Sequence, residues 1–168
     1  MRTLVIYYSL EGNTKFIAQT ITGIIDADIL ELKPKIDIQK YGFMKYFWGG
    51  KQVVMKEKPE LWPFDKRPQE YDLLFIGTPV WNGSHAPALN TFFTQANLKN
   101  KKIALFCCHS GDSRGERNTL IKMKESLLGN EIIGELGFTE PLKKDKDSNA
   151  NKARTWAKNI ILNNVRKS

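Results

Sequence analysis

The chain has 168 residues, of which 41% are hydrophobic and 26% charged, and its formal net charge at pH 7 is +8. This length fits one domain over residues 1–168 and is large enough to bury a core without disulfides or metals. No apolar run reaches the roughly 20 residues that span a bilayer, and the N-terminus lacks the apolar segment of a secretory signal, so we expect a cytoplasmic protein with no membrane segment.

The first predicted elements are a strand over Leu4–Tyr8 and a helix whose apolar pattern begins at Phe16. The turn between them reads SLEGNT. Gly12 permits a positive φ, and short polar side chains lie beside the unpaired amides of the first helical turn. Such amides, with the positive end of the helix dipole, suit a phosphate. The same residues also fit a capped turn that binds nothing.

A second predicted strand, Asp28–Leu32, precedes a long connection over residues 33–70, which holds an excess of four positive charges. Five aromatic residues lie within eight positions there: Tyr41, Phe43, Tyr46, Phe47 and Trp48. One interpretation is a lid or a homodimer patch, since long connections in compact domains are often functional. The other is a helix that packs its aromatic side onto the sheet.

The remaining pattern alternates strands and helices. Strands are predicted over Asp72–Thr78, Lys102–Cys108 and Glu131–Phe138, and helices over Pro87–Ala96, Glu116–Leu128 and Ser148–Val165. Short apolar strands separated by helices indicate a mostly parallel sheet covered on both faces. Ligands bind such sheets at the carboxyl ends of the strands. The loops after the first, third and fourth strands, SLEGNT, TPVWNGSHAP and CHSGDSRGE, therefore form the predicted site.

Cysteine and histidine side chains are few. Cys107 and Cys108 are adjacent in a predicted strand, so they should point to opposite faces, as small buried residues rather than as a zinc site or a disulfide. His85 and His109 lie in the predicted loops, where each either contacts a ligand or substrate or is a solvated bystander.

The positive charge is concentrated in two segments. Residues 143–168 carry an excess of six positive charges, which could attract an acidic partner, but their lysines alternate with apolar residues at helical spacing. A solvated helix face is therefore the favoured interpretation, and nucleic acid is not the expected partner.

The three loops, in this order and spacing, resemble those of the flavodoxin family. The resemblance implies an α/β, flavodoxin-like, doubly wound, five-stranded parallel sheet of order 2-1-3-4-5, with helices on both faces and FMN as cofactor. It implies that the phosphate is held by Ser9, Gly12, Asn13 and Thr14 together with the backbone of Glu11 and Lys15. It places the isoalloxazine between two sets: Thr78, Pro79, Val80, Trp81, Asn82 and Gly83 on one side, and His109, Ser110, Gly111 and Asp112 on the other.

The resemblance also implies the function. The first possibility is an electron carrier whose flavin serves redox partner proteins, acidic ones given the basic charge. The alternative is an NAD(P)H-dependent flavin or quinone oxidoreductase that passes electrons to a small acceptor. In both, the flavin supplies the chemistry and the protein supplies position and electrostatics. A third reading, a fold that has lost its cofactor, is disfavoured because the glycines and short polar residues of all three loops are intact.

Overall fold

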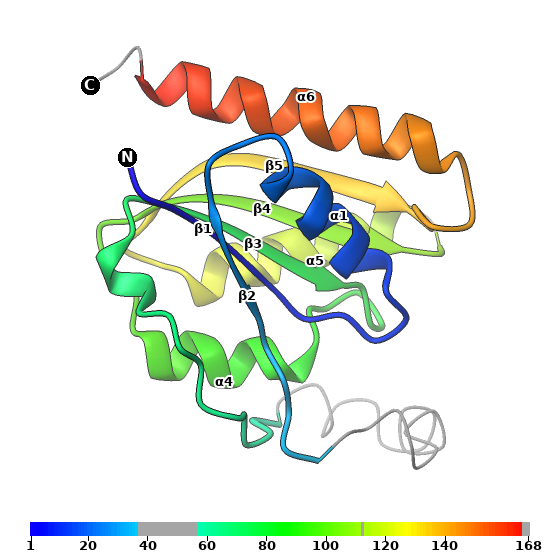
Figure 1. Cartoon of the computed structure of the whole chain (residues 1–168). Coiled ribbons are helices and arrows are strands. Elements are labelled where there is room, and N and C mark those ends of the chain that lie inside the picture. Colours follow the sequence, from blue (N-terminus) through cyan, green and yellow to red (C-terminus); the bar gives the residue numbers. More distant parts are fainter. Residues whose placement is uncertain (37–56, 112, 166–168) are drawn as a thin grey trace.

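The computed structural model describes residues 1–36, 57–111 and 113–165. Its centre is a five-stranded parallel sheet of order β2-β1-β3-β4-β5, with helices on both faces (Figure 1), which confirms the predicted fold class and strand order. In chain order the elements are β1 (Thr3–Tyr7), α1 (Asn13–Thr22), β2 (Asp28–Glu31), the short 3-10 helix η2 (Pro68–Glu70), β3 (Leu73–Pro79), α4 (Pro87–Ala96), β4 (Lys102–His109), α5 (Ser113–Ser126), β5 (Glu131–Thr139) and α6 (Lys146–Val165).

The boundaries agree with the sequence pattern to within one residue for the strands and for α4. The largest difference is α5, which was predicted over Glu116–Leu128 but begins at Ser113 and ends at Ser126. Its first turn contains no apolar residue, so hydrophobic periodicity could not detect it. The earlier start matters because it brings the N-terminus of α5 directly behind the loop that follows β4.

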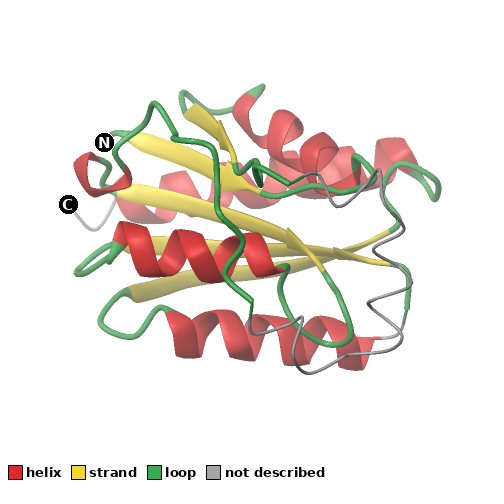
Figure 2. Ribbon diagram, turned by 90° about the horizontal axis from the view of Figure 1, so that it is seen from below, coloured by secondary structure: helices red, strands yellow, loops and turns green. Residues whose placement is uncertain are grey.

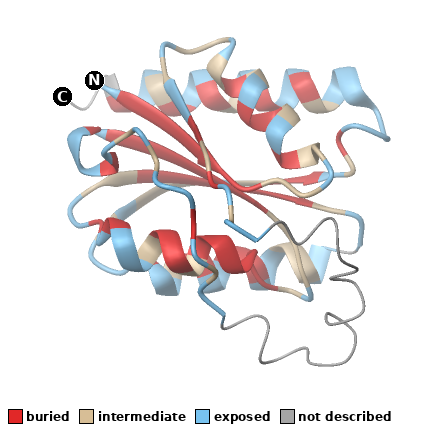
Figure 3. Cartoon of the chain, turned by 60° about the horizontal axis from the view of Figure 1, so that its bottom comes forward, coloured by how far each residue is buried: buried red, intermediate tan, exposed pale blue. Residues whose placement is uncertain are grey.

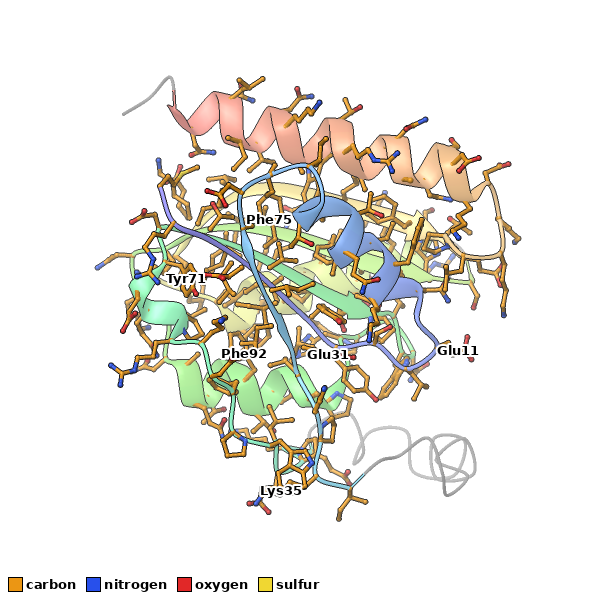
Figure 4. All side chains as sticks on the ribbon, in the orientation of Figure 1. Glu11, Glu31, Lys35, Tyr71, Phe75 and Phe92 are labelled. Atoms are coloured by element: carbon orange, nitrogen blue, oxygen red, sulfur yellow. The ribbon has the colours of Figure 1, made fainter. Side chains whose placement is uncertain are left out.

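Two layers of helix enclose the sheet. α1 and α6 cover one face and α4 and α5 the other, as Figures 1 and 2 show from two directions. All five residues of β1 are buried, and those from Leu4 to Tyr7 alternate between the two apolar clusters, with Leu4 facing α4 and α5 and Val5 facing α1 and α6. Phe75 and Phe92, labelled in Figure 4, belong to opposite clusters. Burial is therefore concentrated along the strands and the inner sides of the helices (Figure 3), as expected for a parallel sheet.

The adjacent cysteines point to opposite faces. Cys107 packs into the cluster on the α4 and α5 side, and Cys108 into the cluster on the α1 and α6 side. Both thiols are free and buried, and burial raises the pKa of Cys108 to about 12. The prediction of small buried side chains on opposite faces is confirmed.

The C-terminal helix has the predicted amphipathic form. Ala153 and Ala157 are fully buried against the sheet, and the Trp156 ring meets Phe75 edge-on at a centroid distance of 5.4 Å. Arg154 and Lys158 are exposed, whereas the Lys152 ammonium donates to the Gly137 carbonyl of β5 at 2.9 Å. Apart from Lys152, the described residues agree with the interpretation of this basic segment as a solvated helix face.

The two described ends of the long connection pair antiparallel with each other just after β2. Lys35 donates its amide to the Glu60 carbonyl, and Trp62 to the Lys33 carbonyl, both at 2.8 Å. The aromatic stretch at positions 41–48 lies outside the described residues, so the lid, the homodimer patch and the packed helix all stay predictions. Over the described ranges, no helix is long and apolar enough to cross a membrane.

Candidate functional site

A pocket of about 260 Å³ opens at the carboxyl ends of β1, β3 and β4. Its walls come from the loops after these strands and from the start of the loop after β5. They consist of Ser9, Leu10, Glu11, Asn13, Thr14, Pro79, Val80, Trp81, Asn82, Cys108, His109, Ser110 and Glu140.

Most of the residues predicted from the sequence meet at this pocket. Ten of the sixteen form its walls, while Gly12, Lys15, Thr78, Gly83 and Gly111 lie behind or beside them, and Asp112 is outside the described residues. Leu10 and Cys108 lie in the predicted loops but were not named as site residues, and Glu140 lies outside these loops. Glu140 could have been found, because it directly follows a strand and all carboxyl ends of a parallel sheet meet at one edge. That the wall residues contact a cofactor stays a prediction.

The loop between β1 and α1, together with the first turn of α1, presents two hydroxyl groups that lack a hydrogen-bond partner among the described residues. Gly12 precedes α1 with φ of +88°, a left-handed conformation that favours glycine, and α1 has no side-chain cap. The Ser9 and Thr14 hydroxyl oxygens are buried and, within the described residues, form no hydrogen bond. Burying a hydroxyl without a partner is unfavourable. An anion at this helix N-terminus would accept hydrogen bonds from both hydroxyls and from the free amides of α1.

The two charged residues of this loop point in different directions. Lys15 is exposed and forms an ion pair with Glu31, with 3.5 Å between Nζ and Oε2, so it is turned away from the pocket. Glu11 is also exposed, and it lies at the tip of the loop in Figure 4, on the pocket wall. Solvent therefore weakens any repulsion between the Glu11 carboxylate and an anion bound below it.

The loop after β3 contains a tight reverse turn. Asn82 and Gly83 have φ of +48° and +66°, and the Trp81 and Ser84 backbones exchange two hydrogen bonds of 2.9 and 3.0 Å across them. Two consecutive left-handed residues match the type I′ turn, for which Asn-Gly is the preferred sequence. Gly83 thus shapes the loop, while Trp81 and Asn82 form its pocket wall.

Thr78 links the two ends of the loop after β3. This fully buried side chain accepts a hydrogen bond of 3.0 Å from the Ala86 amide, across the loop. Thr78 therefore supports the loop and does not line the pocket. At the pocket, the Trp81 ring meets Tyr8 edge-on at a centroid distance of 5.6 Å.

His109, at the end of β4, is held on both sides. Its Nδ1 lies 3.0 Å from the Gly111 carbonyl oxygen, and its Nε2 lies 3.0 Å from Oε2 of Glu116 on α5. Only 7% of its side chain is exposed. His109 is therefore not a solvated bystander. Its partner Glu116 ends the predicted segment CHSGDSRGE but was not named among the site residues, because no sequence pattern shows which side chain the His109 ring meets.

His85 lies away from the pocket, in the core beneath α4. It is 5% exposed, with Nε2 2.8 Å from Oδ1 of Asn90 and its ring edge-on to Phe93. Its Nδ1 is buried with no partner among the described residues. Burial lowers its pKa, against the opposing effect of the Asn90 bond. The reading of His85 as a solvated bystander is wrong, because the side chain is buried, and the residue does not form part of the pocket wall.

A fourth loop, after β5, closes over the first. The Leu142 amide donates to Oδ1 of Asn13 at 3.1 Å, and a Cβ on Gly12 would lie 3.3 Å from the Leu142 side chain. Glu140 donates its amide to the His109 carbonyl at 2.8 Å. A hydrogen bond from Lys144, whose Nζ lies 2.7 Å from its Oε2, lowers the pKa of Glu140. Hydrogen bonds thus join the loops after β1, β4 and β5 around the pocket.

Comparison with known proteins gives a consistent result. A family model described as flavodoxin matches residues 2–132. The flavodoxin-like domain-containing protein BilS of Clostridioides difficile (strain CD3) is 31% identical over 137 residues, which make up 80% of this chain. The match spans 63% of that relative's length.

Solved structures of flavoproteins are also similar to this chain. The crystal structure of a flavoprotein in complex with FMN from Lactobacillus acidophilus NCFM is 27% identical, with a TM-score of 0.70, over 88% of this chain and 98% of the other. Oxidised flavodoxin 2 from Bacillus cereus, at 17% identity, shows the same fold with a TM-score of 0.63, over 97% of this chain and 99% of the other.

Proposed function

The chain belongs to the flavodoxin family, and from this premise we propose that its pocket binds FMN and that the protein transfers electrons through the bound flavin. One observation carries the proposal: the buried hydroxyls of Ser9 and Thr14, which have no partner in the part of the chain that the structure describes, lie at the N-terminus of α1, in the same pocket as the loops after β3 and β4. Such a site fits a ligand with an anionic end and a larger planar body.

Different residues of the pocket would hold the phosphate and the isoalloxazine of FMN. Ser9, Thr14 and the first amides of α1 would hold the phosphate, since phosphates bind well at helix N-termini. The isoalloxazine would lie between the wall from Val80 to Asn82 and the wall formed by His109 and Ser110. The flavin supplies one- and two-electron redox chemistry when bound, and these residues bind it, orient it and limit its contact with water.

For the kind of redox protein, we propose an electron carrier that serves redox partner proteins. Family membership supports this role, and the net charge of +8 favours partners with acidic surfaces. The flavoprotein of Lactobacillus acidophilus, whose structure contains FMN, supports the choice of cofactor. An NAD(P)H-dependent flavin or quinone oxidoreductase is the alternative outcome of the experiment below.

The cofactor is tested by titrating the apoprotein with FMN and with riboflavin while following flavin fluorescence. FMN should bind at least about a hundredfold more tightly, because riboflavin forms none of the charge-assisted hydrogen bonds, each worth about 1.5–3 kcal/mol. Equal dissociation constants would overturn the phosphate assignment.

The carrier role is tested on the FMN complex under anaerobic conditions. Neither NADH nor NADPH alone should bleach the flavin absorbance within minutes, whereas dithionite should. Rapid bleaching by either nucleotide would replace the carrier with the reductase.

A further inference from the structure

The pocket wall over residues 81–82 is attached to the rest of the fold on both sides of its reverse turn. On the side of β3, the Val80 amide donates to the Cys108 carbonyl of β4 at 2.8 Å. On the other side, His85 directly follows the turn, and its side chain reaches α4. The position of the wall therefore depends in part on what holds the His85 ring.

The His85 ring is held by the carboxamide of Asn90. Its Nε2 lies 2.8 Å from Oδ1 of Asn90, and the ring meets Phe93 edge-on at a centroid distance of 5.5 Å. A carboxamide oxygen only accepts hydrogen bonds, so Nε2 is the donor, whether or not Nδ1 also carries a proton. His85 is buried, so water competes little for this bond. The contact between the pocket loop and α4 is therefore independent of the charge on the ring.

The other end of the same carboxamide reaches the segment that returns from the long connection. Nδ2 of Asn90 donates to the Glu57 carbonyl at 3.0 Å, which also fixes Oδ1 as the end that faces His85. The neighbouring Thr91 hydroxyl donates to the Pro59 carbonyl at 2.7 Å. The segment passes across α4 in Figure 2. One side chain thus ties the backbone of this segment to the pocket loop.

Beyond Pro59, the segment pairs with the chain just after β2. The Lys35 amide donates to the Glu60 carbonyl and the Trp62 amide to the Lys33 carbonyl, in an exposed part of the molecule. Hydrogen bonds of this kind open by local motion, without unfolding of the core. Hydrogen exchange of the Lys35 and Trp62 amides therefore measures how firmly the segment is held.

We propose that Asn90 is a positioning residue that couples the pocket wall over residues 81–82 to the segment over residues 57–62, so that flavin binding and docking of this segment on α4 stabilise each other. The inference rests on the proposed FMN site. A flavin that packs against the wall restricts the loop after β3, and with it His85 and Asn90. The Glu57 carbonyl then meets a donor that is already in place, at a smaller cost in conformational entropy. By linkage, a firmly docked segment raises the affinity for flavin by the same factor.

Hydrogen exchange followed by NMR tests the effect of flavin on the segment. Saturating FMN should slow exchange of the Lys35 and Trp62 amides by about threefold to tenfold, the equivalent of one net hydrogen bond. The Asn100 amide, which donates to the Gly129 carbonyl at the opposite end of the sheet, should exchange at the same rate with and without FMN. No slowing at Lys35 and Trp62 would overturn the coupling.

The variant H85F cuts the tie on the side of the pocket loop, because phenylalanine keeps an aromatic ring but cannot donate to Asn90. FMN should then no longer slow exchange of the two amides, and its dissociation constant should rise by about threefold to tenfold. N90A, which removes both ends of the tie, should behave in the same way. T94V is the matched control: the exposed Thr94 hydroxyl donates to a backbone carbonyl within α4, and its removal should leave exchange and affinity as in the wild type.

The variant T91V loosens the segment from α4 without touching the pocket loop. It should raise the dissociation constant for FMN by about threefold in the wild-type background and have no effect in the H85F background, where the tie is already cut. A purely structural effect of H85F on the pocket would leave the T91V factor unchanged. The same T91V factor in both backgrounds would therefore overturn the proposal, as would equal slowing of exchange by FMN in the wild type and in H85F.

Failure of the proposed function gives a different result. Flavin fluorescence would then show no binding to the wild type or to any variant. In that case the apoprotein decides whether Asn90 holds the segment: faster exchange of the Lys35 and Trp62 amides in N90A than in T94V would support it as the positioning residue, and equal rates would overturn it.

Discussion

Two hydroxyl groups in the first loop distinguish a binding site from a capped turn. A capping side chain accepts a hydrogen bond from a first-turn amide, yet α1 has no side-chain cap, and the Ser9 and Thr14 hydroxyls are buried without partners in the described structure. Buried polar atoms without hydrogen-bond partners reduce stability unless a ligand supplies the missing hydrogen bonds. The free energy lost in the apoprotein should therefore be recovered on binding.

The variant Thr14→Val tests whether stability lost in the apoprotein is recovered as ligand affinity, because it keeps the side-chain shape and removes the hydroxyl. We expect the free energy of unfolding of the apoprotein to rise by about 1 kcal/mol, and the dissociation constant for FMN to rise at least about tenfold. Urea denaturation and fluorescence titration measure the two quantities. Thr119→Val is the matched control, since that hydroxyl donates to the Gly115 carbonyl at 2.8 Å: it should lower stability and leave FMN affinity unchanged. Parallel behaviour of the two variants would contradict the prediction.

His85 should make stability sensitive to acid. Burial lowers its pKa in the folded state, so the folded protein holds the neutral ring while the unfolded chain takes up a proton below about pH 6.5. Its contribution to stability is complete above that pH and is lost as pH falls toward the folded-state pKa. His85→Gln should therefore lose less stability than the wild type between about pH 7.5 and about pH 5.5. Urea denaturation at both pH values gives the comparison, and equal losses would show that His85 is protonated without cost.

At the scale of elements, the strands β3 and β4 meet where a side chain would not fit. Gly77 pairs with Tyr7 on one side and with Phe106 on the other, and the Phe106 ring lies across its face. The Gly77 carbonyl also accepts the Tyr8 amide, just before the first loop leaves the sheet. The close packing of these strands thus supports the start of the pocket.

Gly77→Ala should lower the free energy of unfolding by about 1–3 kcal/mol, the usual cost of overpacking a core. A Cβ there would lie only 2.1 Å from the Phe106 ring, whereas a Cβ on Gly111 would meet nothing within 4 Å. Gly111→Ala is therefore the control and should change stability by less than about 0.5 kcal/mol. Similar losses in the two variants, measured by urea denaturation, would show that the Phe106 ring moves aside freely.

At the scale of the whole molecule, the pocket joins parts of the chain that are distant in sequence. Its walls come from the loops after β1, β3, β4 and β5, and hydrogen bonds from Leu142 to Asn13 and from Glu140 to His109 connect three of them. Unfolding any of these strands destroys the site. A ligand that binds only the folded form should therefore stabilise the entire described sheet.

Thermal unfolding gives the corresponding prediction. FMN at about one hundred times its dissociation constant should add about 2.7 kcal/mol, which raises Tm by about 5–10 °C in a protein of this size. Riboflavin at the same concentration should raise it much less. Gly77→Ala, which destabilises the core without touching a pocket wall, should start from a lower Tm and show the same increase. An unchanged Tm with FMN would contradict the proposed site.

Local regularities in the sequence were enough to predict most of the fold. Apolar runs such as Leu4–Tyr8, and the helical spacing around Ala153, follow from the periods of strand and helix, which depend on neighbours a few residues away. The same reasoning placed Cys107 and Cys108 on opposite faces and located three of the four loops at the pocket.

Tertiary structure alone decided how the site is built. Glu116 reaches His109, Leu142 reaches Asn13, and Thr78 closes a loop, through contacts that have no periodic signal because each depends on the path of irregular backbone, whether its partners are near in the chain or, like Leu142 and Asn13, far apart. The burial of His85 is likewise set by the packing of α4. The sequence by itself therefore determined the sheet, its order by family resemblance and the edge that carries the site. Which side chains face the pocket, and which only support it, depended on long-range packing and hydrogen bonding.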